Sequence, residues 1–88
     1  MPKIRFTRRF IKSFTRLPAS VQEKVKKQLA LLAEDPRHPS LQTIPVQGAS
    51  GIYEARVDID YRLTYEREKD DTMILRVVAR HDKALKNP

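Results

Sequence analysis

Two arginines stand at positions where a phosphate group could be bound. Arg56 lies near the end of one predicted strand and Arg62 near the start of the next, with a short turn between them. On neighbouring strands their side chains would share one face, and a guanidinium pair suits a phosphate because arginine donates in pairs and keeps its charge. The alternative is cross-strand pairing with Glu54 or Glu66, which would contribute roughly 0.2–1 kcal/mol.

The chain has two histidines, and each is a candidate acid or base because the reference pKa of imidazole lies near neutrality. His81 follows the last predicted strand, whereas His38 lies in a proline-rich loop. The ordinary alternatives are a strand-end histidine with a local hydrogen bond and a loop histidine on the surface. Residue type and position alone favour these alternatives for both histidines.

Asp60 and Tyr61 come just before Arg62, at the entrance of the same predicted strand. By strict alternation Tyr61 points with Leu63 and Tyr65 toward the helices, which indicates core packing. Because alternation is loose at the first residue of a strand, stacking of Tyr61 against a nucleic-acid base stays open.

Motifs that hold metals or cofactors are missing from the sequence. The two histidines lie far apart, cysteine is absent, and neither an HExxH motif nor a glycine-rich phosphate loop occurs. We therefore expect no metal site and no cofactor. Without cysteine there is also no disulfide framework, which fits a reducing compartment.

The formal net charge is +7, and the excess lies in the first part of the chain. Residues 1–51 carry ten Lys and Arg against three Asp and Glu, whereas residues 52–88 carry eight of each class. A one-sided basic surface is the electrostatic footprint of a protein that binds a polyanion, most simply RNA. The alternative is a solvated helix face on which the charges serve solubility. The cations concerned are Arg8, Arg9, Lys12, Arg16, Lys24 and Lys27.

Secretion and membrane insertion are disfavoured by the hydropathy of the sequence. The N-terminal residues contain no apolar stretch long enough for a secretory signal, and no apolar run is long enough to cross a membrane. We therefore expect a cytoplasmic protein. A length of 88 residues suits one small domain, so we expect residues 1–88 to fold as a single unit.

The elements that position these side chains can be inferred from periodicity and from helix end signals. A short strand at 3–6 is followed by Thr7, a suitable N-cap for a first helix. Pro18 suits the first position of a second helix, which Asp35-Pro36 ends because the residue before proline leaves the α region. The two helices therefore form a hairpin. Their apolar stripes are Phe10, Phe14 and Leu17 on the first helix and Val21, Val25, Leu29 and Leu32 on the second.

The second half of the chain reads as strands. Residues 36–51 hold three prolines and both glycines and are predicted to form a loop. The order β-α-α-β-β-β indicates an α+β fold, an antiparallel four-stranded sheet with a helical hairpin on one face. The other face, which carries the two arginines, is expected to be open. The remaining predicted elements are strands at 52–57, 61–66 and 73–80 and a short helix at 83–86.

The segment GIYEARVDIDYRLTYE and the ending RHDKAL resemble the RelE/ParE superfamily of bacterial toxin–antitoxin toxins. The similarity runs from IRFTRRFIKSF to LRVVARHDKAL and covers nearly the whole chain. It implies a RelE-like fold and a cognate antitoxin protein as partner. RelE-type members cut messenger RNA in the decoding site of the ribosome, so the resemblance also implies an endoribonuclease that inhibits translation, with ribosome and mRNA as partners.

The resemblance implies roles for particular residues. The arginine of YRL, Arg62, would hold the scissile phosphate. His81 would act as general acid or base, as does a histidine near the C-terminal end of the YafQ-subgroup sequences. Asp60 and Tyr61 match an acidic–aromatic pair of that subgroup, and Arg56 stands where the subgroup has a histidine. The implied RNA contacts are Tyr61, Arg80, Lys83, Arg8, Arg9, Lys12, Arg16, Lys24, Lys27 and His38, the last from a loop similar to the subgroup's HPLQG loop.

Cleavage of this kind needs no metal, because the ribose 2′-OH attacks its own adjacent phosphate. Arg62 and Arg56 would stabilise the growing charge, His81 would move a proton, and Asp60 would orient the attacking hydroxyl. Two alternatives stay open: a ParE-like inhibitor of DNA gyrase without nuclease activity, and a non-catalytic member that binds only RNA or its antitoxin. The pair of Arg62 and His81 argues against the first alternative.

Overall fold

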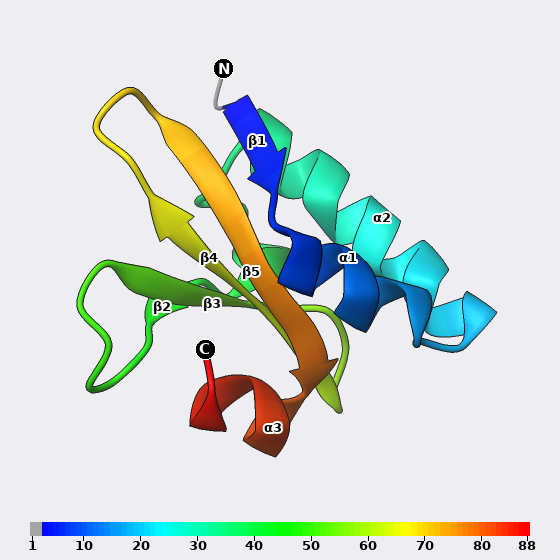
Figure 1. The fold of residues 1–88 in the computed structure, drawn as a ribbon. Coiled ribbons are helices and arrows are strands. Elements are labelled where there is room, and N and C mark those ends of the chain that lie inside the picture. The colour runs from blue at the N-terminus through cyan, green and yellow to red at the C-terminus, as the bar shows by residue number, and fades with distance from the viewer. Residues whose placement is uncertain (1–2) are drawn as a thin grey trace.

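Residues 3–88, which this computed structural model describes, build a mixed β-sheet with helices on both faces (Figure 1). The predicted α+β order of one strand, two helices and three long strands is confirmed. The strands are β1 (Lys3–Phe6), β2 (Ile44–Pro45), β3 (Ile52–Arg56), β4 (Tyr61–Arg67) and β5 (Thr72–Arg80). The helices are α1 (Arg8–Thr15), α2 (Ala19–Glu34) and α3 (His81–Lys86), with a 3-10 turn, η1, at Pro39–Leu41.

The sheet has five strands in the order β1-β5-β4-β3-β2. β3, β4 and β5 form the expected antiparallel meander, but β1 runs parallel to β5, with Lys3 opposite Thr72 and Phe6 opposite Leu75. β3 also runs in the direction of β1, because β3 and β5 are both antiparallel to β4. The fifth strand, β2, lies within the predicted loop and pairs with β3 at the sheet edge. Pro45 is tolerated there because one side of an edge strand needs no N–H.

Thr7 ends β1 and starts α1. Its N–H and its hydroxyl both donate to the carbonyl of Leu75, over 3.2 and 2.8 Å, and the hydroxyl oxygen accepts from the N–H of Phe10 over 3.1 Å. The predicted N-cap is therefore confirmed. α2 begins directly after Pro18 and ends before Pro36, also close to prediction.

The core forms between the sheet and helices α1 and α2. Tyr65 is its largest buried side chain, its ring stacks on Tyr53 with centroids 5.7 Å apart, and burial raises the pKa of the Tyr65 hydroxyl. The buried cluster comprises Phe10, Val21, Val25, Leu32, Leu41, Ala55, Val57, Leu63, Tyr65, Met73, Leu75 and Val78.

The buried side of α2 carries one polar residue. Val21, Val25 and Leu32 are buried as predicted, but Gln28, 6% exposed, completes the stripe in place of the half-buried Leu29. A buried amide needs partners, because an unpaired polar group in the core is costly.

Gln28 finds its partners on two other elements. Its Nε2 donates to the backbone carbonyl of Arg56 over 2.7 Å and to that of Ser40 over 3.3 Å. One side chain therefore fastens α2 to the end of β3 and to η1.

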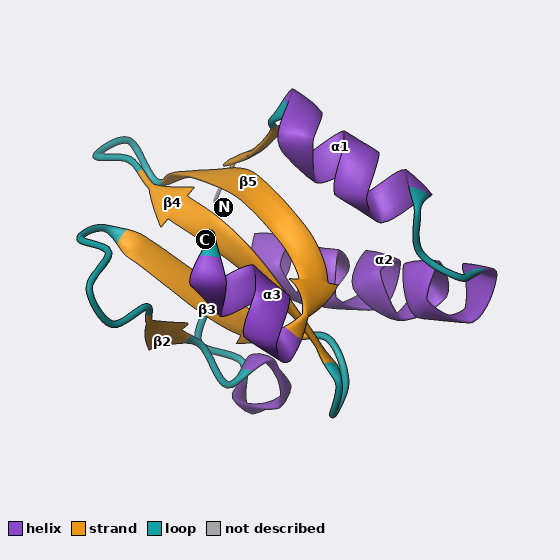
Figure 2. Cartoon of the chain, turned by 60° about the horizontal axis from the view of Figure 1, so that its bottom comes forward, coloured by secondary structure: helices purple, strands orange, loops and turns teal. Residues whose placement is uncertain are grey.

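The sheet face away from α2 is not open as expected, because α3 lies across β4 and β5 on that side (Figure 2). Ala84 of α3 and Thr64 of β4 are fully buried, and Glu54 of β3 is 7% exposed. Alternation identified the side chains that point to this face. It carries no information about which later segment covers them.

Replacing Gln28 by leucine should destabilise the fold. Leucine keeps much of the volume, but the carbonyls of Ser40 and Arg56 lose their donor. We expect the free energy of unfolding to fall by about 1–3 kcal/mol in urea titrations. The control is Gln47→Leu at an exposed position, with a change within about 0.5 kcal/mol. An unchanged urea midpoint for Gln28→Leu would contradict the role given to this residue.

Candidate nucleic-acid interface

Three strand ends meet at one end of the sheet, and predicted site residues lie there. Arg56, the last residue of β3, is the register partner of Arg62 in β4. Tyr61, the first residue of β4, is the register partner of Arg80 at the end of β5. Backbone pairing alone therefore gathers two arginines of one sheet face next to an arginine–tyrosine pair.

His81 begins α3 directly after β5. Its backbone N–H donates to the carbonyl of Asp60 over 2.8 Å, which ties the start of α3 to the turn before β4. The imidazole is about half exposed, and its Nδ1 lies 3.4 Å from Oδ1 of Asp82. Across residues 3–88, no hydrogen bond or ion pair joins the imidazole to Arg56 or Arg62.

The turn between β3 and β4 is held by charged side chains. Asp58 accepts from the N–H groups of Asp60 (2.9 Å) and Tyr61 (2.8 Å), and its Oδ2 lies 3.2 Å from Nζ of Lys24. Arg62 closes the turn from the other side, since its Nη1 donates to the carbonyls of Asp58 (2.6 Å) and Tyr61 (2.9 Å). The turn is therefore a fixed platform at the entrance of β4.

The two predicted phosphate-binding arginines differ in availability. The side chain of Arg62 is 16% exposed, and its Nε lies 3.8 Å from Oε1 of the buried Glu54. Arg56 makes one side-chain hydrogen bond, from Nη1 to Oε1 of Gln42 over 3.3 Å, at the surface. Arg56 is thus the guanidinium that an incoming anion can reach more easily, and phosphate binding by Arg62 stays a prediction.

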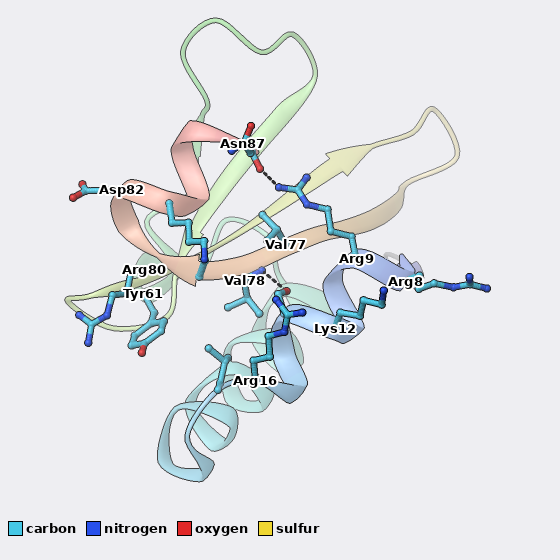
Figure 3. Close-up of a pocket in the computed structure, with 14 residues that line it drawn as sticks. Arg8, Arg9, Lys12, Arg16, Tyr61, Val77, Val78, Arg80, Asp82 and Asn87 are labelled. Atoms are coloured by element: carbon cyan, nitrogen blue, oxygen red, sulfur yellow. Dashed lines mark hydrogen bonds between the residues drawn. The ribbon is translucent and has the colours of Figure 1, made fainter.

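A groove of about 850 Å³ opens between α1 and α3 along the end of β5 (Figure 3). Leu17, Val77 and Val78 are among its apolar lining residues, and Asp82 is its one carboxylate. In the described part of the chain, none of the cations that line it pairs with a side-chain carboxylate. These six cations are Arg8, Arg9 and Lys12 of α1, Arg16 directly after α1, Arg80 of β5 and Lys83 of α3.

Two of the groove arginines have defined partners. Arg9 donates to the backbone carbonyls of Asn87 and Pro88, which ties α1 to the segment after α3. Arg80 lies over the ring of Tyr61, with Cζ 5.3 Å from the ring centroid. Arg9 therefore connects two walls of the groove, α1 and the segment after α3, whereas Arg80 contacts the neighbouring strand.

Three predicted RNA contacts lie outside this groove. Lys24 is paired with Asp58, Lys27 is exposed on α2, and the Nδ1 of His38 accepts from the N–H of Ser40 over 3.2 Å. The structure thus separates the cations of α2 from those of α1.

Sequence reasoning missed the residues that organise the site. Asp58 could have been found, because an aspartate that accepts from the N–H two residues later is a recognised turn pattern. Ser13 of α1 accepts from the N–H of Val78 over 3.0 Å, across 65 residues of sequence. No local signal marks Ser13, since its partner is fixed only by the fold.

No group of three or more His, Asp or Glu side chains within residues 3–88 is placed to hold a metal ion. Over the same residues, no helix combines the length and the apolar character that a membrane crossing requires.

A family model described as the ParE toxin of the type II toxin–antitoxin system parDE matches residues 4–84. The chain belongs to this toxin family. The inferred membership of the RelE/ParE superfamily is therefore confirmed. No curated protein gives a significant sequence match.

Solved toxin structures share the fold of this ParE-family toxin. The archaeal RelE–RelB complex from Pyrococcus horikoshii OT3 matches with a TM-score of 0.75 at 20% identity, over 94% of this chain and 98% of that chain. The RelBE2 complex from Mycobacterium tuberculosis matches with a TM-score of 0.76 at 22% identity, over 92% and 100%. YafQ from E. coli strain BL21(DE3) matches with a TM-score of 0.74 at 20% identity, over 94% and 97%. At these identities the likeness establishes the fold.

Asp58 should make the stability of this toxin depend on pH. Burial alone would raise the pKa of Asp58, but hydrogen bonds from the N–H groups of Asp60 and Tyr61 and the nearby Lys24 ammonium together lower it. A carboxylate with a lowered folded pKa stabilises the fold above its unfolded pKa of about 3.9, and that stabilisation is lost as the pH falls further.

We therefore expect Asp58→Asn to be less stable than the wild type at pH 7, with the difference shrinking between about pH 4 and pH 2. Urea unfolding at several pH values measures it. Asp82→Asn, at a fully exposed carboxylate, is the control, and its free energy of unfolding should change with pH as that of the wild type does. A pH-independent difference for Asp58→Asn would show that the turn does not depend on the ionised carboxylate.

Proposed function

We propose that this ParE-family toxin is an endoribonuclease that cuts messenger RNA on the ribosome and so inhibits translation. The observation that carries the proposal is the gathering of Arg56, Arg62, Asp60 and His81 at one sheet end, beside a groove rimmed by six cations. A guanidinium pair, a carboxylate and an acid–base group are the set that attack by a ribose 2′-OH requires.

Cleavage exchanges one bond to phosphorus for another: the 2′-hydroxyl loses a proton and the 5′-oxygen gains one. The 2′-oxygen attacks the adjacent phosphorus, the bond from phosphorus to the 5′-oxygen breaks, and a 2′,3′-cyclic phosphate and a 5′-hydroxyl result. His81, with its half-exposed imidazole, would give a proton to the leaving 5′-oxygen, while Asp60 would orient the attacking hydroxyl, whose own proton would pass to water. Arg56 would contact the phosphate first, and Arg62 would join by exchanging turn carbonyls for phosphate oxygens.

The groove suits RNA phosphates on either side of the cut. Its cations come from different elements but line one groove, so their positive fields add within it. Such binding weakens steeply with salt, because counterions are released from the phosphates. The ribosome would place the message at the sheet end. Because ribosomes lie in the cytoplasm, the toxin would act there as a cytoplasmic protein.

A cognate antitoxin would compete for the same charges. The Pyrococcus and Mycobacterium relatives were solved as complexes with their antitoxins, which supports a protein partner of this kind here. An acidic antitoxin segment laid over the groove would neutralise the field that RNA needs.

Inhibition of DNA gyrase is the second candidate function. It is favoured by the description of the matching family and by the engagement of Arg62 with backbone carbonyls. A gyrase inhibitor needs a binding surface and no acid–base group, so His81 would then be dispensable.

Substitution of the proposed acid should abolish most of the cleavage. With programmed ribosomes, we expect His81→Gln to lower the rate at which new 5′ ends appear by roughly 10²–10⁴. Primer extension on the message measures the rate, and thermal unfolding confirms that the variant is folded. Arg37→Gln, an exposed arginine outside the groove, is the matched control and should cleave like the wild type. Equal rates for His81→Gln and the wild type would remove this histidine from the mechanism.

The two candidate targets can be separated directly. In a reconstituted translation system the purified toxin should block protein synthesis, because cleaved messages cannot be read. In a gyrase supercoiling reaction at the same toxin concentration the product should be unchanged. The reverse pattern would establish the gyrase reading and overturn the nuclease proposal.

A further inference from the structure

Arg80 has one side covered by an aromatic ring at the mouth of the groove. Its Cζ lies 5.3 Å from the centroid of the Tyr61 ring, and Figure 3 shows the two side chains extending side by side. Arg80 is exposed, whereas Tyr61 is half-buried and packs against the core. In residues 3–88 no carboxylate pairs with Arg80. The tyrosine therefore supports the guanidinium from the protein side and leaves its outer side to solvent.

We propose that Arg80, backed by Tyr61, is a stacking site for a nucleobase of single-stranded RNA. The inference rests on the proposed function for the identity of the ligand, and it adds a site where a base, not a phosphate, is held. A guanidinium is planar and stacks on bases as well as on aromatic rings. Because Tyr61 already orders the arginine, less side-chain freedom is lost when a base stacks on the outer side.

The place of Arg80 in the chain makes such a base useful. Arg80 directly precedes His81, and its register partner Tyr61 directly precedes Arg62. A base stacked on Arg80 would hold its own nucleotide next to the proposed acid and the phosphate-binding arginines. The groove cations would take the phosphates further along the strand, so the stacking site would fix which phosphodiester reaches the sheet end.

A carboxylate of an acidic partner protein is the other group that Arg80 could bind. A carboxylate needs only the positive charge and N–H donors, and lysine supplies both. A base needs the planar group, which lysine lacks. The substitution Arg80→Lys therefore separates the two ligands while the net charge stays the same.

Binding should be measured by fluorescence anisotropy at low ionic strength, with a labelled RNA hexamer whose 2′-O-methyl riboses prevent cleavage. We expect Arg80→Lys to weaken binding about tenfold, the scale of one lost base–side-chain stack. Replacing one base of the hexamer by an abasic residue should weaken wild-type binding by a similar factor and leave Arg80→Lys unaffected. The control is Arg5→Lys, the same chemical change outside the groove, which should bind like the wild type.

Each outcome decides the proposal. Equal affinity of Arg80→Lys and the wild type would make Arg80 a charge contact only and overturn the stacking site. Binding that ignores the abasic position, or no binding by the wild type, would overturn it as well. The failure of the proposed nuclease function is seen separately: base-dependent binding without cleavage on ribosomes would keep the stacking site and remove the nuclease.

Discussion

The length of β1 decides where the groove can form. β1 pairs with β5 only as far as Leu75, and there Thr7 takes the last carbonyl and turns the chain into α1. Beyond that point the edge of β5 has no strand beside it, and Ser13 of α1 supplies one of the missing backbone bonds at Val78. From there on α1 takes the place of β1 beside β5, and the groove opens between α1, the end of β5 and α3. A β1 strand longer by a few residues would fill the groove with backbone.

The same geometry explains why so many cations lie together. α1 is short and buries only Phe10 completely, so most of its surface is free to carry charge. The sequence places Arg8, Arg9 and Lys12 there and Arg16 directly after the helix, and none of them pairs with a side-chain carboxylate in the described chain. Like charges at such spacing repel each other, and this repulsion costs stability in the free protein. A bound polyanion removes that cost and adds stability to the folded state.

The sequence predicts local features here better than long-range ones. Thr7 as N-cap and the end of α2 before Pro36 could be predicted because each depends on residues within one turn. The direction of β1, the strand at Ile44–Pro45 and the cover provided by α3 could not, because they depend on partners far away in the chain. Gln28 shows a subtler limit. Positions 28 and 29 both fit a helical stripe within its tolerance, and hydrophobicity favoured the leucine, yet the buried position faces two carbonyls that only an amide can satisfy.

For the site itself, strand register could be predicted and side-chain direction could not. Alternation placed Arg56 and Arg62 on one face, and the register confirms that they are neighbours. Alternation does not predict where the guanidinium of Arg62 points. In the structure it donates to carbonyls of the turn and lies beside Glu54. An arginine buried this far is retained in its place by hydrogen bonds rather than by solvent, so any anion that recruits it must offer oxygens at least as good as those carbonyls. A phosphate meets that requirement because its oxygens are charged, whereas a neutral ligand would leave Arg62 where it is.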